Sequence, residues 1–133
     1  MSVAVAHQDT ATGRLALREA AQQAGYRNTR LTVIHIADSV DLDLVEAHKA
    51  KLHDDVAAAL SEISIGELDW DLALAPGDGV ENTAATILEL ADKADAELLV
   101  IGARRRSPVG KALLGSVTQT LILDADIPVL VVK

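Results

Sequence analysis

Short aliphatic segments alternate with segments of helical periodicity along this chain, and this alternation constrains the fold more than any other feature. Strands are predicted at residues 1–6, 31–36, 68–74, 98–101 and 128–132, with helices at 12–24, 42–63, 82–91 and 116–123 between them. The segments 98–101 and 128–132 are continuous aliphatic runs, as expected for strands covered on both faces. Such an order indicates an α/β fold with a mostly parallel sheet and right-handed crossovers.

Polar residues and a glycine suggest where two of these helices begin or end. Thr12 is expected to cap the first helix, and Gly25 to end it. Asn82 is a candidate N-cap of the third predicted helix. Residues 68–74 alternate apolar and other side chains, which favours a half-exposed strand at an edge of the sheet.

Composition fits one aliphatic core. The 133 residues have the common size of a single domain, so one domain over 1–133 is expected. Half of the residues are hydrophobic, yet the chain has no Phe, one Trp and one Tyr, and its core must therefore consist of Ala, Val, Leu and Ile. Aliphatic cores of this kind are typical of sheets covered by helices.

Charge and cysteine content exclude several classes of function. A formal net charge of −8 disfavours binding to nucleic acid or to anionic membrane surfaces, because those polymers attract proteins of the opposite sign. Without cysteine there is no disulfide framework, thiolate nucleophile or cysteine-ligated metal. No apolar run approaches the ~20 residues that span a bilayer, and no signal peptide is visible, so a cytoplasmic location is expected.

Two loops are candidates for a ligand site, because open parallel sheets bind ligands beyond the carboxyl ends of their strands. They are residues 6–13 and 102–116. The second follows a buried strand and leads into a helix, where glycines let backbone amides approach phosphate oxygens and the hydroxyls of Ser116 and Thr118 add donors. A solvated loop that ends in a helix cap is the alternative, and the spacing of glycine and serine leaves both open.

The basic part of this loop is not a P-loop. Gly110 and Lys111 are followed by Ala112, so the hydroxyl that would hold magnesium is missing. Residues 104–106 are three consecutive arginines and form the densest positive cluster of an acidic chain. Beside a phosphate, Arg104 and Arg105 are able to form forked, charge-assisted hydrogen bonds; the alternative is that they only solvate the loop.

A longer motif carries a resemblance to a known family. It consists of Gly102, the basic loop, Leu113-Leu114-Gly115-Ser116-Val117, a helix, and Ile127-Pro128-Val129-Leu130-Val131-Val132. This combination closely resembles the C-terminal half of universal stress proteins. The N-terminal half matches the same family in pattern more than in identity.

The resemblance implies a fold and a function. The implied fold is Rossmann-like, of the adenine nucleotide alpha hydrolase type: a five-stranded parallel sheet in the order 3-2-1-4-5 with helices on both faces. The implied function is a cytoplasmic stress-response protein that binds ATP, or a related nucleotide such as AMP, with magnesium accompanying the phosphates. Adenine would lie near Ala6 and Ile36. The phosphates and ribose would lie on Gly102, Gly115, Ser116, Val117 and Thr118, assisted by Arg104 and Arg105.

Two departures from the family pattern concern this site. Nucleotide-binding members carry Gly, two residues, Gly, nine residues, then Gly and Ser or Thr, and here Arg105 replaces the second glycine. The arginine either obstructs the ligand or supplies a phosphate contact. The family's Val-Asp-Gly-Ser after the first strand becomes Val5-Ala6-His7-Gln8-Asp9, so Asp9 takes the place of the usual aspartate only if the loop is shifted.

The resemblance leaves alternatives to nucleotide binding open. The family commonly dimerises through its last strand, and a homodimer is expected through the segment that begins at Ile127 and ends at Val132. A nucleotide-free dimeric module with a regulatory protein partner is the main alternative. Dedicated ATP hydrolysis is not expected, because no residue is identified that would position water. His7 is expected to be a polar lining residue rather than a catalytic base, and His35 a structural histidine.

Overall fold

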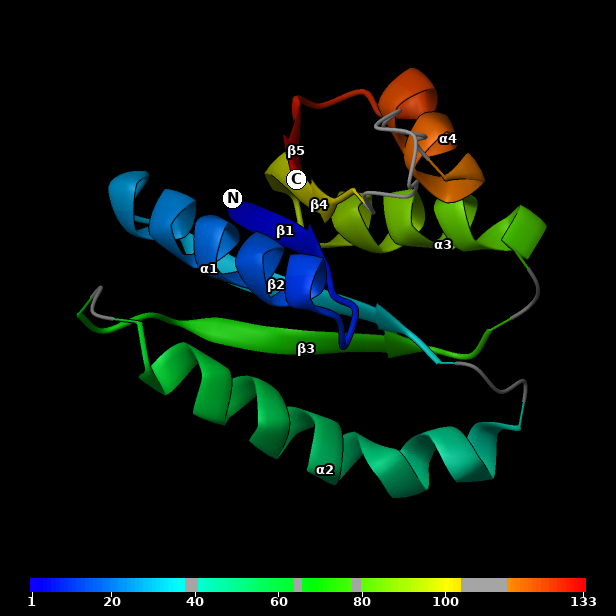
Figure 1. Cartoon of the computed structure of the whole chain (residues 1–133), viewed down its shortest axis with the longest axis horizontal. Helices are drawn as coiled ribbons and strands as arrows, with labels where there is room; N and C mark the ends of the chain where they lie inside the picture. The colour runs from blue at the N-terminus through cyan, green and yellow to red at the C-terminus, as the bar shows by residue number, and fades with distance from the viewer. Residues whose placement is uncertain (38–40, 64–65, 78–79, 104–114) are drawn as a thin grey trace, which may run out of the picture.

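Helices and strands alternate along the computed structural model, which describes residues 1–37, 41–63, 66–77, 80–103 and 115–133. The elements are β1 (Ser2–Ala6), α1 (Ala11–Tyr26), β2 (Arg30–Ile36), α2 (Leu42–Ser61), β3 (Trp70–Ala75), α3 (Val80–Lys93), β4 (Ala96–Gly102), α4 (Ser116–Asp124) and β5 (Val129–Val132) (Figure 1). The predicted α/β alternation is therefore confirmed.

The strands form one five-stranded parallel sheet in the order β3-β2-β1-β4-β5, which confirms the expected order. Val5 in β1 is the register partner of Val33 in β2 and of Val100 in β4. Because β2 and β4 lie on opposite sides of β1, the chain changes direction across the sheet between these two strands. The carboxyl ends of β1 and β4 are therefore the expected place for a ligand.

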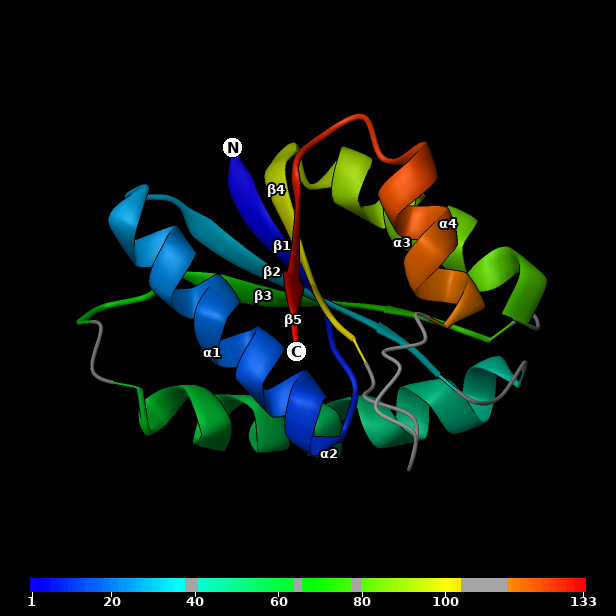
Figure 2. The same ribbon diagram turned by 45° about the horizontal axis from the view of Figure 1, so that its top comes forward.

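Two aliphatic cores lie on opposite faces of the sheet, so helices cover both faces as predicted (Figures 1 and 2). Side chains of α1 and α2, such as Leu17 and Val56, pack with Val5 on one face. Side chains of α3 and α4, such as Ile87 and Leu121, pack on the other. Successive residues of each inner strand point to opposite faces, which explains the continuous aliphatic runs.

The first helix begins and ends at residues other than those predicted. Thr10, rather than Thr12, is the N-cap, and its Oγ1 accepts a hydrogen bond of 2.9 Å from the amide of Gly13. The helix continues through Gly25, because glycine in a last turn weakens a helix without breaking it. Asn28 adopts the left-handed conformation, with φ of 52°, which asparagine tolerates better than most residues.

The third helix also begins earlier than predicted. It starts at Val80, so Asn82 lies inside its first turn and does not precede it. The carbonyl of Asn82 accepts a hydrogen bond of 2.9 Å from Thr86 Oγ1. A polar residue near a helix start is therefore an ambiguous signal, because Asn also occurs within the first turn.

The strand β5 lies at one edge of the sheet. Its inner side is paired, since the carbonyls of Pro128 and Val132 accept hydrogen bonds from the amides of Leu99 and Ala103. All four of its residues are half-buried. Within the described ranges, no helix is long and apolar enough to cross a membrane.

Candidate functional site

A cavity of about 630 Å³ opens at the carboxyl ends of β1, β2 and β4. It lies at the point where the strand order changes direction, as expected for an open parallel sheet. Its walls come from the ends of these strands, the loop after β1, part of α3 and the first turn of α4. The volume falls within the range of about 300–1,000 Å³ that is usual for small-molecule sites.

The cavity brings together most of the residues predicted from the sequence. On the side of β1 and β2 it is lined by Ala6, His7, Asp9 and Ile36, and on the side of β4 and α4 by Gly102, Val117 and Thr118. Gly115 and Ser116 are exposed and lie beside it, outside its lining. Arg104 and Arg105 lie outside the described residues.

One wall of the cavity is apolar. Ala6 and Ile36 are half-buried there, and buried Ile34, Ile101 and Leu121 lie behind them. The sequence analysis placed these last three within predicted strands and a predicted helix and did not assign them to the site. A residue at a strand end can be told apart as a core residue or a cavity-lining residue only once the neighbouring strands are placed. The wall offers an apolar surface of the kind that lines small-molecule sites.

The opposite side of the cavity contains the N-terminus of α4. Gly115 is its N-cap, with φ of −64°, and has no side chain to accept from the first-turn amides. Val117 and Thr118 of that turn line the cavity. A helix N-terminus without a side-chain cap offers backbone donors and the positive end of the helix dipole to an anion.

Gly13 fixes the loop that forms the rim, a role that was not predicted. A Cβ atom on Gly13 would lie 2.0 Å from the carbonyl oxygen of Gln8. The loop can therefore fold over the first turn of α1 only because residue 13 is glycine. The available signal was a glycine near the start of a helix, where propensity disfavours it.

Gly102 packs against α1, which gives a reason for glycine in addition to the predicted approach of the backbone to phosphate. A Cβ atom there would lie 3.0 Å from Thr12 Cγ2 and 3.1 Å from the Thr12 carbonyl oxygen. The space that the missing side chain leaves is filled by the start of α1. Gly102 thus lines the cavity and also sets the distance between β4 and α1.

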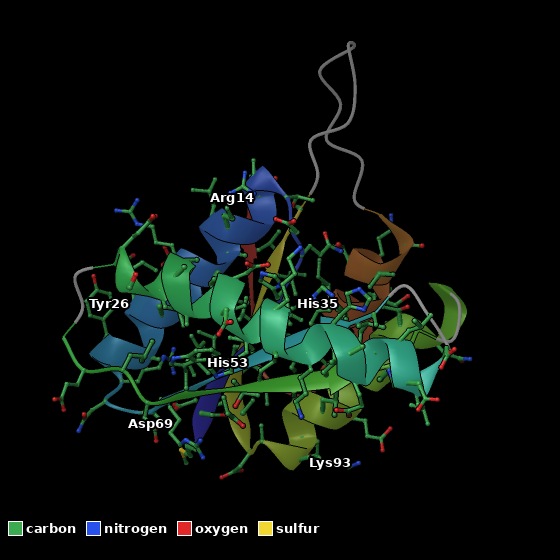
Figure 3. All side chains as sticks on the ribbon, turned by 90° about the horizontal axis from the view of Figure 1, so that it is seen from below. Arg14, Tyr26, His35, His53, Asp69 and Lys93 are labelled. Atoms are coloured by element: carbon green, nitrogen blue, oxygen red, sulfur yellow. The ribbon has the colours of Figure 1, made fainter. Side chains whose placement is uncertain are left out.

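Two histidines meet at the cavity. His7 Nδ1 lies 3.2 Å from His35 Nδ1, and the ring centroids are 5.3 Å apart at 49°. Both rings line the cavity. Ile34 belongs to the core on the face that α3 and α4 cover, so the next residue, His35, lies on the face of the sheet that α2 covers (Figure 3). His7 is a lining residue, as predicted. The contact with His35 was not predicted, because the two residues are 28 positions apart in sequence.

Burial lowers the pKa of His7 below its ordinary value of 6.5, and the neighbouring His35 lowers it further. The carboxylates of Asp9 and Asp55 oppose this by raising the pKa. Burial is the largest of these effects, so the electrostatics favour a neutral His7 at neutral pH.

Asp9 lines the cavity with a largely exposed side chain. Its side chain is 93% exposed and lies 3.5 Å from Arg14 Nη1. An ion pair so exposed contributes little to stability. In the part of the chain that the structure describes, no three His, Asp or Glu residues are grouped to hold a metal ion.

Comparisons with known proteins identify the family. The model of the universal stress protein family matches residues 1–133. A universal stress protein of Mycolicibacterium smegmatis is 40% identical over 122 residues, which cover 91% of this chain and 88% of that protein.

Solved structures agree with this match. The universal stress protein from Archaeoglobus fulgidus in complex with dAMP is 25% identical with a TM-score of 0.74, covering 100% of this chain and 98% of that one. A universal stress protein in complex with cAMP is 25% identical with a TM-score of 0.68, covering 99% of this chain and 96% of that one. The chain belongs to the universal stress protein family.

Proposed function

We propose that this protein binds an adenine nucleotide in the cavity at the carboxyl ends of β1, β2 and β4, and acts as a cytoplasmic stress-response protein. The observation that carries the proposal is the juxtaposition, across one cavity, of an apolar wall at Ala6 and Ile36 with the uncapped N-terminus of α4. An adenine ring requires the first and a phosphate the second. Relatives in complex with dAMP and cAMP support the same ligand class.

In this proposal the ligand has a defined direction. Adenine lies against Ala6 and Ile36, the ribose lies near Gly102, and the phosphates lie at the first turn of α4. Thr118 contributes its hydroxyl from the lining, whereas Gly115 and Ser116 contribute backbone amides from beside it. ATP and AMP both fit this direction, and magnesium would be held mainly by the phosphates of ATP.

Arg104 and Arg105 are assigned a supporting role. Both follow closely in the chain after β4, whose last residue, Gly102, lines the cavity. A guanidinium offers paired donors to phosphate oxygens. Arg105 would therefore supply a charged side-chain contact to the phosphate in place of the backbone contact that the family's glycine allows.

Calorimetric titration with ATP, in the presence and absence of magnesium, and with AMP tests the proposal. Saturable binding with micromolar affinity is expected for at least one of them. Thr83→Val lies in the cavity lining and is expected to weaken binding, whereas Thr86→Val lies one turn further along α3, outside the lining, and is a matched control. Absence of binding by all of these ligands would refute the proposal.

A dimeric interaction module without nucleotide is the second candidate function. The half-buried edge strand β5 favours it, because an unpaired strand edge with apolar side chains is a template for pairing with a second copy. The segment between Ile127 and Val132 would form the homodimer interface, and a regulatory protein would be the further partner. A dimer is compatible with nucleotide binding, so the two candidate functions are not separated by the oligomeric state. They are separated by the titrations, in which the second candidate predicts that no nucleotide binds.

A further inference from the structure

We propose that His7 and His35 act as one proton-sharing pair, which takes up a proton when an anionic adenine nucleotide binds and so makes affinity rise as pH falls. This inference rests on the proposed function, since it concerns the regulation of the same site. It is carried by the contact between the two rings and by their position in the cavity lining.

The distance between the rings determines how protons are shared. At 3.2 Å, Nδ1 of one histidine donates a hydrogen bond to Nδ1 of the other, so one proton lies between them. In the neutral pair the donor ring therefore carries its proton on Nδ1 and the acceptor ring carries its proton on Nε2. The tautomers of the two histidines are linked through this contact.

The same geometry admits one additional proton. A proton added to Nε2 of the donor ring leaves the contact intact and makes it a charge-assisted hydrogen bond, which is stronger. A second additional proton would have to occupy the acceptor Nδ1, and two N–H groups would then face each other across 3.2 Å. The pair thus changes between zero and one positive charge while its contact is kept.

The groups around His7 favour its neutral form without ligand. Burial and the second histidine lower the pKa of His7, whereas Asp9 from the loop after β1 and Asp55 from α2 raise it. Arg14 of α1 lies beside Asp9 and weakens that carboxylate's effect. An anion in the cavity that the pair lines would add a negative charge to the same site, and opposite charge favours the protonated form.

The pair is also the source of positive charge in the described part of the cavity. No lysine or arginine occurs among the described lining residues. Among the described lining residues, an anion bound there therefore meets backbone and hydroxyl donors, and a protonated histidine is the side chain that adds a full positive charge. Because binding and protonation favour each other, proton uptake and affinity must change together with pH.

Calorimetry in two buffers tests this inference with cAMP as the probe. Its phosphodiester does not titrate near neutral pH, so any proton exchanged belongs to the protein. Titrations at pH 7 in buffers of low and high ionisation enthalpy give the number of protons taken up. We expect a substantial fraction of one proton, and an affinity that rises by about three- to tenfold between pH 8 and pH 6. Adenosine, which is neutral, is expected to bind without this uptake.

Variants separate the pair from its surroundings. His35→Asn keeps a polar group near the Nδ1 position but cannot share a proton with His7, so proton uptake and the pH dependence of affinity should be reduced. His48→Asn alters an exposed histidine of α2, whose Nδ1 contacts the Leu44 carbonyl outside the cavity, and should leave both unchanged.

The outcomes distinguish this inference from the proposed function. Binding of cAMP without proton uptake, or unchanged uptake in His35→Asn, would overturn the proton-sharing pair and leave nucleotide binding standing. If AMP binds and cAMP does not, AMP serves as the probe. The number of protons taken up by the protein is then obtained by subtracting the proton of the AMP phosphate, which ³¹P NMR measures. Failure of both to bind would overturn the proposed function and this inference with it.

Discussion

The missing side chain of Gly13 leaves room for the carbonyl oxygen of Gln8, which lies 2.0 Å from the position a Cβ atom would occupy. This close approach joins the first turn of α1 to the loop that forms the cavity rim. Gly13, a packing residue of α1, thereby positions the loop with Gln8 at the cavity rim.

Gly13→Ala is expected to destabilise the protein, because its Cβ would meet a backbone atom that cannot rotate away. The loss should be about 1–3 kcal/mol in the free energy of unfolding, despite the better helix propensity of alanine. Gly25→Ala is the matched control, since Gly25 is exposed in the last turn of the same helix and should gain up to about 1 kcal/mol. Urea unfolding measures both, and equal effects of the two substitutions would contradict the packing argument.

The stability of the ligand-free protein should fall on mild acidification because of His7. Its pKa is lowered in the folded state, so the unfolded chain binds a proton first as pH falls below 6.5. The contribution of His7 to the free energy of unfolding is therefore largest above pH 6.5. It is lost between pH 6.5 and the lower pKa of His7 in the folded state. Urea unfolding at several pH values from 8 to 5.5 should give a smaller loss for His7→Gln than for wild type. An identical slope for the two proteins would show that His7 is not responsible.

Thr118→Val is expected to weaken binding of AMP about tenfold, since a hydrogen bond to a charged phosphate would be lost. Thr118 is half-buried in the cavity lining. Thr120→Val is the control in the same helix, because Thr120 is exposed and its Oγ1 donates to the Ser116 carbonyl at 2.9 Å. Calorimetric titration should give wild-type affinity for the control. If the two variants bind alike, the phosphate does not lie at this turn.

Dimerisation through β5 makes a prediction about its outer edge. Pro128 and Val132 bond inward to β4, so the backbone groups of Val131 point to the free edge by the alternation of a strand. Val131→Pro should therefore preserve pairing with β4 but remove a donor from the edge, and sedimentation velocity should show a monomer where wild type is a dimer. Val131→Thr keeps the amide and should remain dimeric. A wild-type monomer at micromolar concentration would argue against this interface.

The sequence predicted the fold well because its signals are local. The aliphatic runs at β4 and β5 and the apolar stripe of α2, with Val45, Val56 and Leu60 buried, depend on periods of a few residues. The helix starts were less accurate, since Thr10 and Thr12 are equally suitable caps by residue type. Only the packing of Gly13 on Gln8 distinguishes them.

The candidate site was predicted partly from the position of its loops after the strands and partly from the family motif. Gly102 and Thr118 could be named in this way, and both line the cavity. The contact of His7 with His35 depends on the register of β1 against β2, which no pattern within either strand determines. The packing of Gly102 on Thr12 could likewise be recognised only once α1 was placed on the sheet.

An amide NMR titration of the ¹⁵N-labelled protein with AMP tests nucleotide binding in this cavity most directly, because it gives affinity and location together. The account predicts saturable shifts with micromolar affinity at Ala6, Ile36, Gly102 and Thr118. Asn28 and Asp95, at the amino ends of β2 and β4, should remain unchanged. Absence of saturable shifts, or shifts centred on β5 instead of the cavity, would contradict it.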